Sequence, residues 1–294
     1  MTTAADKARH LKIWHGTPTF ELLKGGVSNA GFKVTDASGT YVARVGEDYP
    51  FHQVSRAREA IAAKAAFNAG LSPEMIHAGD GVMVLRYVTA RTYEEADVRN
   101  NWQACVDIVK RCHHEMPRQI LGQGAIFWVF QIIRDYGATL IAKNHARAAE
   151  VPRWNAVVDE MEAAQVPLPI IFGHHDLLPT NFLDDGKRLW LIDWEYGAFG
   201  TAMFDLANLA AANSFDDGLE HKMLTRYFDK EPDSPLLRAF LAMKVAAALR
   251  EATWGMISEL FLNAPGVDYV AYAAEYLGRF EVILKTYEQR FKKS

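Results

Sequence analysis

The first third of the chain contains short segments in which hydrophobic and polar positions alternate. They are separated by glycine-containing turns and by one alanine-rich stretch with an apolar face that ends at Gly70. Alternation with a period of two predicts half-buried strands, whereas the alanine-rich stretch predicts a helix with a C-terminal glycine. The predicted strands are Phe20–Leu23, Gly31–Thr35, Tyr41–Val45, Met75–Ala78 and Val82–Val88, and the predicted helices are Asp6–Trp14 and Val54–Ala69.

After residue 90 the hydrophobic pattern repeats with the period of a helix. Predicted helices cover 101–116, 127–144, 152–164, 204–213, 218–228, 235–262 and 267–292. Two short apolar runs, Pro169–Phe172 and Arg188–Ile192, predict strands instead. We therefore predict an α+β, two-lobed chain, with an N-terminal antiparallel-sheet lobe at residues 1–90 and a larger, mostly helical lobe at residues 91–294.

Composition excludes several classes of protein. The chain has 294 residues, 50% of them hydrophobic, and a net charge of -4, which argues against nucleic acid or an anionic membrane as a partner. Residues 1–10 contain no apolar signal segment, and the most apolar windows are short or interrupted by charges, so we expect a cytoplasmic protein without membrane insertion. Cys105 and Cys112 lie about two turns apart on one predicted helix, which predicts two buried thiols rather than a disulfide.

The residues with the clearest chemistry lie between the two short predicted strands of the second lobe. His174, Asp176 and Asn181 have the spacing H-x-D-x-x-x-x-N, and Asp193 follows the apolar run that ends at Ile192. A kinase catalytic loop and its metal-binding aspartate have this layout. Asp176 would accept the proton of a substrate hydroxyl. Asn181 and Asp193 would provide oxygen ligands for Mg²⁺, so we predict phosphoryl transfer from ATP by these three catalytic residues.

A glycine turn precedes the second predicted strand. Gly25, Gly26, Ser28 and Asn29 form a segment whose backbone N–H groups could approach phosphate oxygens closely. Adjacent glycines in a hairpin are more often only a turn. Their place upstream of the Asp and Asn motif favours a nucleotide-binding loop.

Five further residues are predicted to bind the nucleotide. Arg44 occupies the position in the third strand where kinases carry a lysine that contacts phosphates, and Glu59, one turn into the following helix, is its candidate partner. Arg44 as a solvated strand residue and Glu59 as a solvated helix residue are the alternatives. The last strand of the lobe leaves through Arg86, Tyr87 and Val88, which we predict to be the hinge where backbone groups bind adenine.

Other chemistries fit the sequence less well. A zinc site is one alternative, because the chain has two pairs of adjacent histidines, His113-His114 and His174-His175. Adjacent side chains on a helix diverge by ~100° and would not bind one ion together, and the zinc spacings H-x-x-x-H and H-E-x-x-H do not occur. A serine hydrolase would need G-x-S-x-G, which is missing too. A glycosidase using Asp176 and Glu195 leaves Asn181 without a role. A pseudokinase that binds nucleotide without turnover remains a further alternative, although all three catalytic positions are filled.

Four motifs together resemble the choline/ethanolamine kinase family, which belongs to the aminoglycoside-phosphotransferase-like branch of the protein-kinase-like fold. They are Gly25–Asn29, His174–Asn181, Ile192–Tyr196 and Phe204–Asn208, and the resemblance extends over about residues 20–285. It implies transfer of the ATP γ-phosphate to the hydroxyl of choline, ethanolamine or a similar amino alcohol. Thiamine, homoserine, methylthioribose and aminoglycosides remain alternative acceptors, and a homodimer remains open.

The resemblance also indicates residues for the acceptor. Trp254 and Tyr269 match aromatic residues of the family's cation cage, and Glu195 and Asp176 complete the predicted substrate residues. Packing between helices is the alternative role for both aromatic residues.

Two positions depart from the family pattern. Ile257 stands where related enzymes have a second tryptophan, and Ala212 stands where they have an acidic cage residue, which Asp216 or Asp217 could replace. The identity of the alcohol therefore stays open.

Overall fold

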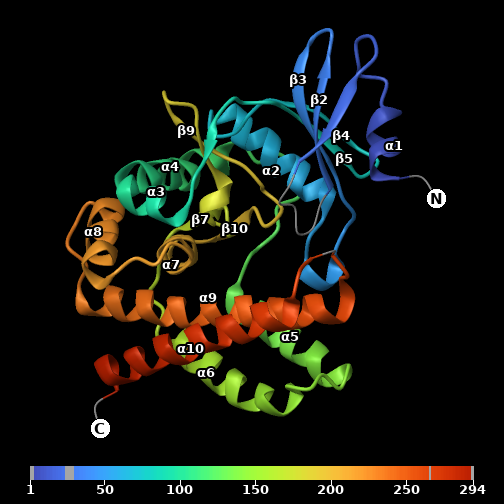
Figure 1. Ribbon diagram of the computed structural model, residues 1–294. Coiled ribbons are helices and arrows are strands. Elements are labelled where there is room, and N and C mark those ends of the chain that lie inside the picture. The colour runs from blue at the N-terminus through green and yellow to red at the C-terminus, as the bar shows by residue number, and fades with distance from the viewer. Residues whose placement is uncertain (1–2, 24–29, 265, 293–294) are drawn as a thin grey trace.

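The computed structural model describes residues 3–23, 30–264 and 266–292 (Figure 1). The strands are β1 (Thr19–Leu22), β2 (Ala30–Asp36), β3 (Gly39–Val45), β4 (Met75–Gly79), β5 (Val82–Arg86), β6 (Arg91–Thr92), β7 (Ile170–Gly173), β8 (Phe182–Asp184), β9 (Leu189–Leu191) and β10 (Ala198–Thr201). The helices are α1 (Ala4–Arg9), α2 (Arg56–Asn68), α3 (Glu95–Asn100), α4 (Trp102–Glu115), α5 (Val129–Ala142), α6 (Val151–Ala163), α7 (Ala202–Ala212), α8 (Asp217–Phe228), α9 (Ser234–Phe261) and α10 (Tyr269–Phe291).

The first five strands form one antiparallel sheet in the order β1-β2-β3-β5-β4. Strands β2 and β3 alternate between buried and more exposed positions, and Val34 and Ala43 on their buried face are fully inaccessible. This alternation is what the sequence pattern predicted, since successive side chains point to opposite faces of a sheet. Helix α2 follows, and the chain leaves it through Gly70, whose φ of +67° lies in the left-handed region that glycine adopts readily.

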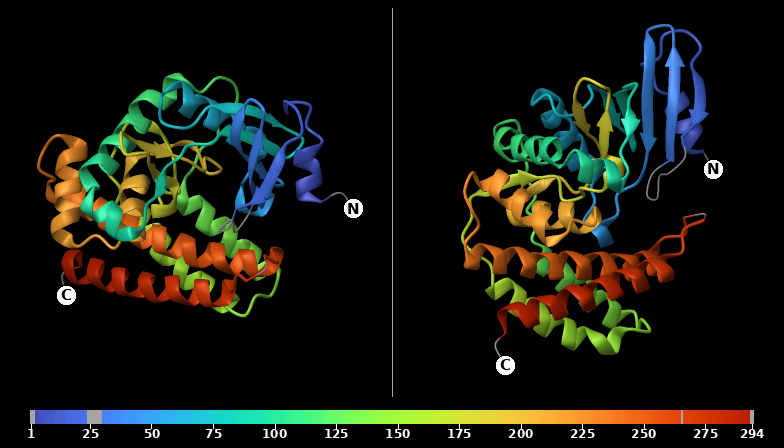
Figure 2. Two further views of the ribbon diagram at one scale, coloured as in Figure 1. Left: turned by 45° about the horizontal axis from the view of Figure 1, so that its top comes forward. Right: turned by 60° about the vertical axis from the view of Figure 1, so that its left-hand side comes forward.

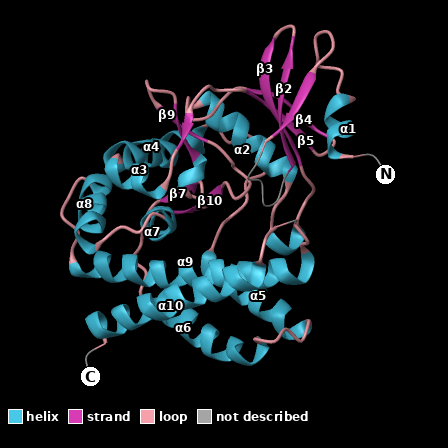
Figure 3. Ribbon diagram, viewed as in Figure 1, coloured by secondary structure: helices cyan, strands magenta, loops and turns pink. Residues whose placement is uncertain are grey.

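The rest of the chain is mostly helical (Figure 3). Helices α9 and α10 lie side by side along the far end of the molecule, with α5 and α6 against them, and the N-terminal sheet stands at the opposite end (Figure 2). Asp233 and Asp268 cap the N-termini of α9 and α10 by accepting hydrogen bonds from Leu236 N and Ala271 N. The predicted α+β architecture is therefore confirmed, while the predicted boundary at residue 90 stays a prediction.

The structure also corrects several predicted elements. The first helix is Ala4–Arg9 rather than Asp6–Trp14, and the fifth strand ends at Arg86 rather than Val88. Strands β6, β8 and β10 and helix α3 were not predicted, because these short segments carry neither a clear period nor a continuous apolar run. Cys105 and Cys112 are free and buried, as expected. Among the described residues, no helix combines the length and the apolarity that a membrane span requires.

Candidate active site

The predicted catalytic loop runs from the end of β7 to a short 3₁₀ turn at Pro179–Asn181, and the β8–β9 hairpin then leads to Asp193. The Asn181 side chain folds back onto Asp176. Its Nδ2 donates to the Asp176 backbone oxygen at 2.8 Å and to the Asp176 Oδ2 at 3.0 Å. These two bonds fix the amide, so that the structure brings together the two residues that the motif placed five positions apart.

Two residues of the loop have left-handed backbone conformations, which non-glycine residues adopt only when their surroundings enforce them. These are His175, with φ of +61°, and Asp193, with φ of +68°. Asp205, at the start of α7, holds the first of them. Its carboxylate accepts hydrogen bonds from His174 N at 2.8 Å and from His175 N at 2.7 Å. Helix α7 therefore sets the backbone immediately before Asp176.

Asp205 is itself fully buried and has a further donor. His113 Nε2 donates to Asp205 Oδ2 at 2.8 Å, and His113 Nδ1 is 2.7 Å from the hydroxyl of Tyr227. Burial alone would raise the pKa of Asp205, but His175 and His113 lower the pKa below its ordinary value. The carboxylate thus stays charged in the interior, because three donors converge on it. The sequence showed Asp205 only as part of a motif and did not indicate His113 in this role.

His174 contributes to the shape of the loop rather than to a metal site. Its ring is buried and its Nε2 lies 2.9 Å from the backbone oxygen of Ile192, which joins the catalytic loop to the segment before Asp193. Gly173 precedes it in a position where a Cβ would come within 2.6 Å of His175 Nε2 and 2.9 Å of Asp205 Oδ2. The loop therefore requires glycine at this position.

Asp176 is half-buried and lies in an acidic environment. Burial raises the pKa of its carboxyl well above the ordinary value, and the charges of Glu251 and Asp193 raise the pKa further, against an opposing contribution from Arg250. A carboxylate with a raised pKa is a stronger proton acceptor once it is deprotonated. The environment therefore suits a general base for an alcohol.

The candidate nucleotide-binding residue Arg44 contacts both Glu59 and Asp193. Arg44 Nη1 donates to Glu59 Oε1 at 2.7 Å, and Arg44 Nη2 donates to Asp193 Oδ1 at 2.7 Å. The predicted pairing of Arg44 with Glu59 is confirmed, and Glu59 is only 1% exposed rather than solvated. Burial alone would lower the pKa of Arg44, but Asp193 and Glu59 raise the pKa above the ordinary value, so that Arg44 stays charged.

Glu195 takes part in the same group of charges. Arg56 Nη1 lies 2.5 Å from Glu59 Oε2 and 3.0 Å from Glu195 Oε2. The two arginines of the group lie on β3 and at the start of α2. The structure thus places Glu195 against Arg56, and its predicted contact with the acceptor stays a prediction.

The predicted hinge lies where β5 ends. The backbone N–H groups of Arg86 and Tyr87 donate to Glu74 O at 2.8 Å and Thr40 O at 3.0 Å, and the Arg86 side chain pairs with Glu74. Among the described residues, the N–H of Val88 has no acceptor. Adenine recognition by this segment therefore centres on Val88 and stays a prediction. Gly25, Gly26, Ser28 and Asn29 lie outside the described residues.

Aromatic side chains of α9 and α10 form a cluster beside the loop. The Trp254 ring makes edge-to-face contacts with Tyr269 at 6.2 Å and with Tyr272 at 5.5 Å between centroids. Trp254 Nε1 donates to the hydroxyl of Tyr196 at 2.9 Å. The structure therefore brings the two predicted cage residues together. Ile257 is fully buried in the core and does not add a ring to this cluster.

Two charged residues next to this cluster, Arg250 and Glu251, were not predicted from the sequence. Glu251 accepts from Arg250 through Oε1, and from the hydroxyl of Tyr272 through Oε2 at 2.7 Å. The Arg250 guanidinium also lies 4.5 Å from the ring centre of Tyr196, in cation–π contact. The spacing of Glu251 three positions before Trp254, which places both on one face of a helix, was the available signal.

The oxygen atoms at the loop suit a hard cation. Asp193 offers a carboxylate, and the Asn181 amide uses its nitrogen for Asp176, so that Oδ1 has no donor among the described residues. Mg²⁺ prefers oxygen ligands of this kind and keeps further positions for water and phosphate. Asn181 and Asp193 therefore fit the ion that was predicted for them.

The model of the phosphotransferase enzyme family matches residues 19–244. Protein LicA of Haemophilus influenzae is 26% identical over 204 residues, which cover 68% of this chain and 59% of that protein. The matched region thus spans about three fifths of this curated relative.

Solved structures are similar over most of the chain. A choline/ethanolamine kinase family protein from Mesorhizobium loti is 28% identical, with a TM-score of 0.77 and coverage of 96% of this chain and 95% of that one. The choline kinase LicA from Streptococcus pneumoniae is 22% identical, with a TM-score of 0.75 and coverage of 91% and 94%.

Proposed function

Since the chain belongs to the phosphotransferase enzyme family, we propose that it transfers the γ-phosphate of ATP to the hydroxyl of an amino alcohol of the choline or ethanolamine type. The observation that carries the transfer is the contact of Asn181 with Asp176 in the catalytic loop, together with the contact of Arg44 with Asp193. A base, a metal-binding pair and a phosphate-binding arginine thereby meet at one place.

In the proposed reaction Asp176 binds the acceptor hydroxyl and takes its proton as the oxygen attacks the γ-phosphorus. A bond forms between the alcohol oxygen and phosphorus, the bond to the bridging oxygen breaks, and ADP leaves. Asn181 and Asp193 would hold Mg²⁺, which neutralises charge on the phosphates. Arg44, positioned by Glu59, contributes a further positive charge for the nucleotide.

Two features support an amino alcohol as acceptor. Trp254, Tyr269 and Tyr272 form an aromatic wall, and aromatic faces bind ammonium groups. Glu251 adds a carboxylate next to Tyr272, close enough to raise the pKa of Asp176. The similar Mesorhizobium loti protein is of the choline/ethanolamine kinase family, which supports this substrate class.

A substrate panel tests the proposal. ADP release with ATP and Mg²⁺ is measured for choline, ethanolamine, thiamine, homoserine, methylthioribose and kanamycin. We expect choline or ethanolamine to have a higher kcat/KM than kanamycin. A strong preference for kanamycin would refute the proposed acceptor class while leaving phosphotransfer intact. If none is phosphorylated although ATP raises the Tm, the chain acts as a pseudokinase.

Trp254 provides a second test of the acceptor. If its ring faces the ammonium group, Trp254→Ala raises the KM for the best cationic acceptor by at least tenfold, because the cation–π contact is lost. Trp254→Phe keeps an aromatic face and retains most of the affinity. An unchanged KM in Trp254→Ala would make Trp254 a packing residue only.

A further inference from the structure

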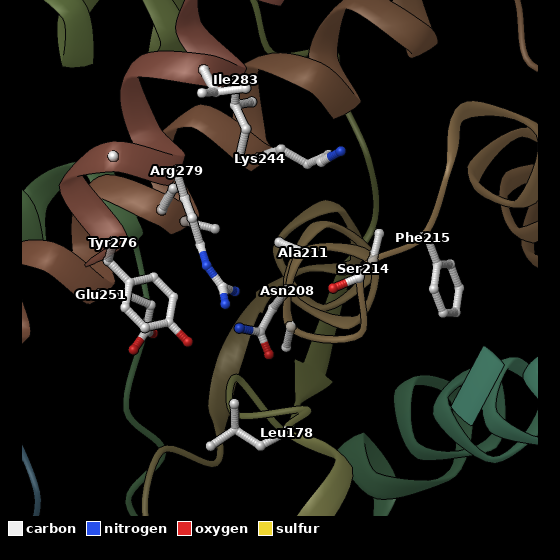
Figure 4. Close-up of a pocket in the computed structure, with 16 residues that line it drawn as sticks. Leu178, Asn208, Ala211, Ser214, Phe215, Lys244, Glu251, Tyr276, Arg279 and Ile283 are labelled. Atoms are coloured by element: carbon white, nitrogen blue, oxygen red, sulfur yellow. The ribbon is translucent and has the colours of Figure 1, made fainter. Parts of the chain in front are cut away.

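A pocket of about 490 Å³ opens next to the catalytic loop, between α7, α9 and α10 (Figure 4). Leu178, two residues after Asp176, forms part of its wall, and so does Asn208, whose Oδ1 accepts a hydrogen bond from Leu177 N at 2.6 Å. Glu251 lines it as well. The pocket is therefore adjacent to the proposed acceptor site through Glu251 and through the loop residue Leu178.

The charged side chains that line this pocket already have partners. Lys244 pairs with Glu220, and Glu251 pairs with Arg250. Arg279 lies 2.6 Å from the carboxylate of Glu275. Because Lys244, Glu251 and Arg279 are each paired, these three residues do not require a charged ligand in the pocket.

The remaining wall is mainly apolar. It includes Ala211, Ala247, Phe215 and Ile283, and Val282, which is 67% exposed, marks the side that faces solvent. Ala212, where the resembling family carries an acidic residue, also lines the pocket and adds neither charge nor bulk. Pockets of ~300–1,000 Å³ hold drug-sized ligands, whereas ethanolamine has only two carbon atoms. The pocket is thus too large and too apolar for the head group alone.

We propose that the acceptor carries a hydrocarbon arm on its amino group, and that this arm lies in the pocket between α7, α9 and α10 while the hydroxyl lies at Asp176. This inference rests on the proposed function and narrows the acceptor to amino alcohols whose nitrogen carries an alkyl chain longer than methyl. The arm does not change during the reaction, so its burial lowers KM and leaves kcat nearly constant.

A homologous series tests the arm. The acceptors are dimethyl-2-hydroxyethylammonium ions whose fourth substituent is methyl, butyl, hexyl or octyl. KM from ADP release and Kd from titration calorimetry are measured for each. We expect each added methylene to lower both constants roughly two- to fourfold until the arm reaches solvent near Val282. Constants that do not depend on chain length would overturn the inference.

Variants locate the arm in this pocket. Ala211→Leu narrows it from α7, and Gly278→Leu narrows it from α10, where a Cβ would meet no atom within 4 Å. In both, the ratio of Kd for the methyl and octyl compounds should approach one. Ala274→Leu, at an exposed position of α10 outside the pocket, should retain the wild-type ratio. A retained ratio in both pocket variants would place the arm elsewhere and refute the proposal.

The two readouts separate this inference from the proposed function. If Kd falls with chain length and the pocket variants abolish that fall, but ADP is never released, the arm site stands and the kinase function is refuted. If ADP is released with all acceptors and both constants are flat, the kinase function stands and the arm site is refuted.

Discussion

The guanidinium of Arg44 lies 2.7 Å from the carboxylate of Asp193, although the two residues are 149 positions apart in the chain. The same guanidinium contacts Glu59, which is almost completely buried. One side chain thus joins β3 and α2 to the segment after β9. The proposed phosphate-binding group and the proposed metal ligand are therefore placed relative to each other by this contact.

Removal of the Arg44 charge should destabilise the fold. In Arg44→Met, Glu59 loses one of its two charged partners among the described residues and keeps Arg56 in a buried environment, so we expect the free energy of unfolding to fall by about 1–3 kcal/mol. Urea unfolding measures this change. The double variant Arg44→Met/Glu59→Gln removes both charges and should recover part of the loss. Equal stability of Arg44→Met and wild type would contradict a structural role for the pair.

Asp176→Asn should abolish most phosphoryl transfer. The amide cannot accept the hydroxyl proton, so we expect kcat with the best acceptor to fall by ~10²–10⁴. The shift of Tm by ADP and Mg²⁺ should persist, since the nucleotide residues are unchanged. Asp159→Asn, at an exposed position on α6, serves as the matched control and should retain wild-type kcat. A fully active Asp176→Asn variant would exclude Asp176 as the base.

Asp205→Asn should weaken the catalytic loop. The amide nitrogen would face backbone N–H groups or His113, each of which is itself a donor, so one buried bond becomes a repulsion. We expect a loss of about 2–4 kcal/mol in unfolding free energy and a lower kcat. His113→Phe removes one donor only and should have a smaller effect on both. The reverse order would contradict the anchoring role of Asp205.

Stability should fall between neutral and acid pH. Burial lowers the pKa of His52 to about 3 and that of His175 to about 4. The unfolded chain binds protons from about pH 6.5 downward while both folded rings stay neutral, so the folded state loses up to ~1.4 kcal/mol per pH unit for each histidine. The stability that the two neutral rings permit is fully present above about pH 6.5. It is lost progressively as the pH falls to the folded-state pKa of each ring, about 4 for His175 and about 3 for His52.

Urea unfolding at several pH values between 7.5 and 4.5 measures this dependence. His52→Gln, which removes one titrating group, should be less stable at pH 7.5 but should lose stability less steeply as the pH falls. Identical slopes for the variant and the wild type would show that His52 does not remain neutral in the fold.

Two glycine substitutions should have opposite effects. Gly278→Ala adds a Cβ in open space on α10, and should stabilise the protein by about 0.5–1 kcal/mol because alanine favours the helix. Gly173→Ala would bring a Cβ against His175 and Asp205, and should lower both Tm and kcat. Thermal unfolding compares them directly. A stable and active Gly173→Ala variant would contradict the close packing of the loop.

Much of the fold could be predicted from local pattern. Strands β2 and β3 and helices α4, α5 and α10 carry clear periods, because each buries one face. Strands β8 and β10 span three and four residues, and their pairing with distant segments is not visible in a local window. The predicted ends of the first helix and of β5 were displaced for a related reason, since terminal residues depend on what they pack against.

The same division applies to the candidate site. Asp176, Asn181 and Asp193 were found by spacing, because their motif lies in one short stretch of chain. His113, Arg250 and Glu251 were not found, because their contacts with Asp205, Tyr196 and Tyr272 join residues far apart in sequence. The sequence by itself determined the elements and the local motif, since these follow from period and spacing. Only the tertiary structure decided which buried charges meet and how large a pocket remains beside them, because both depend on the packing of helices in three dimensions.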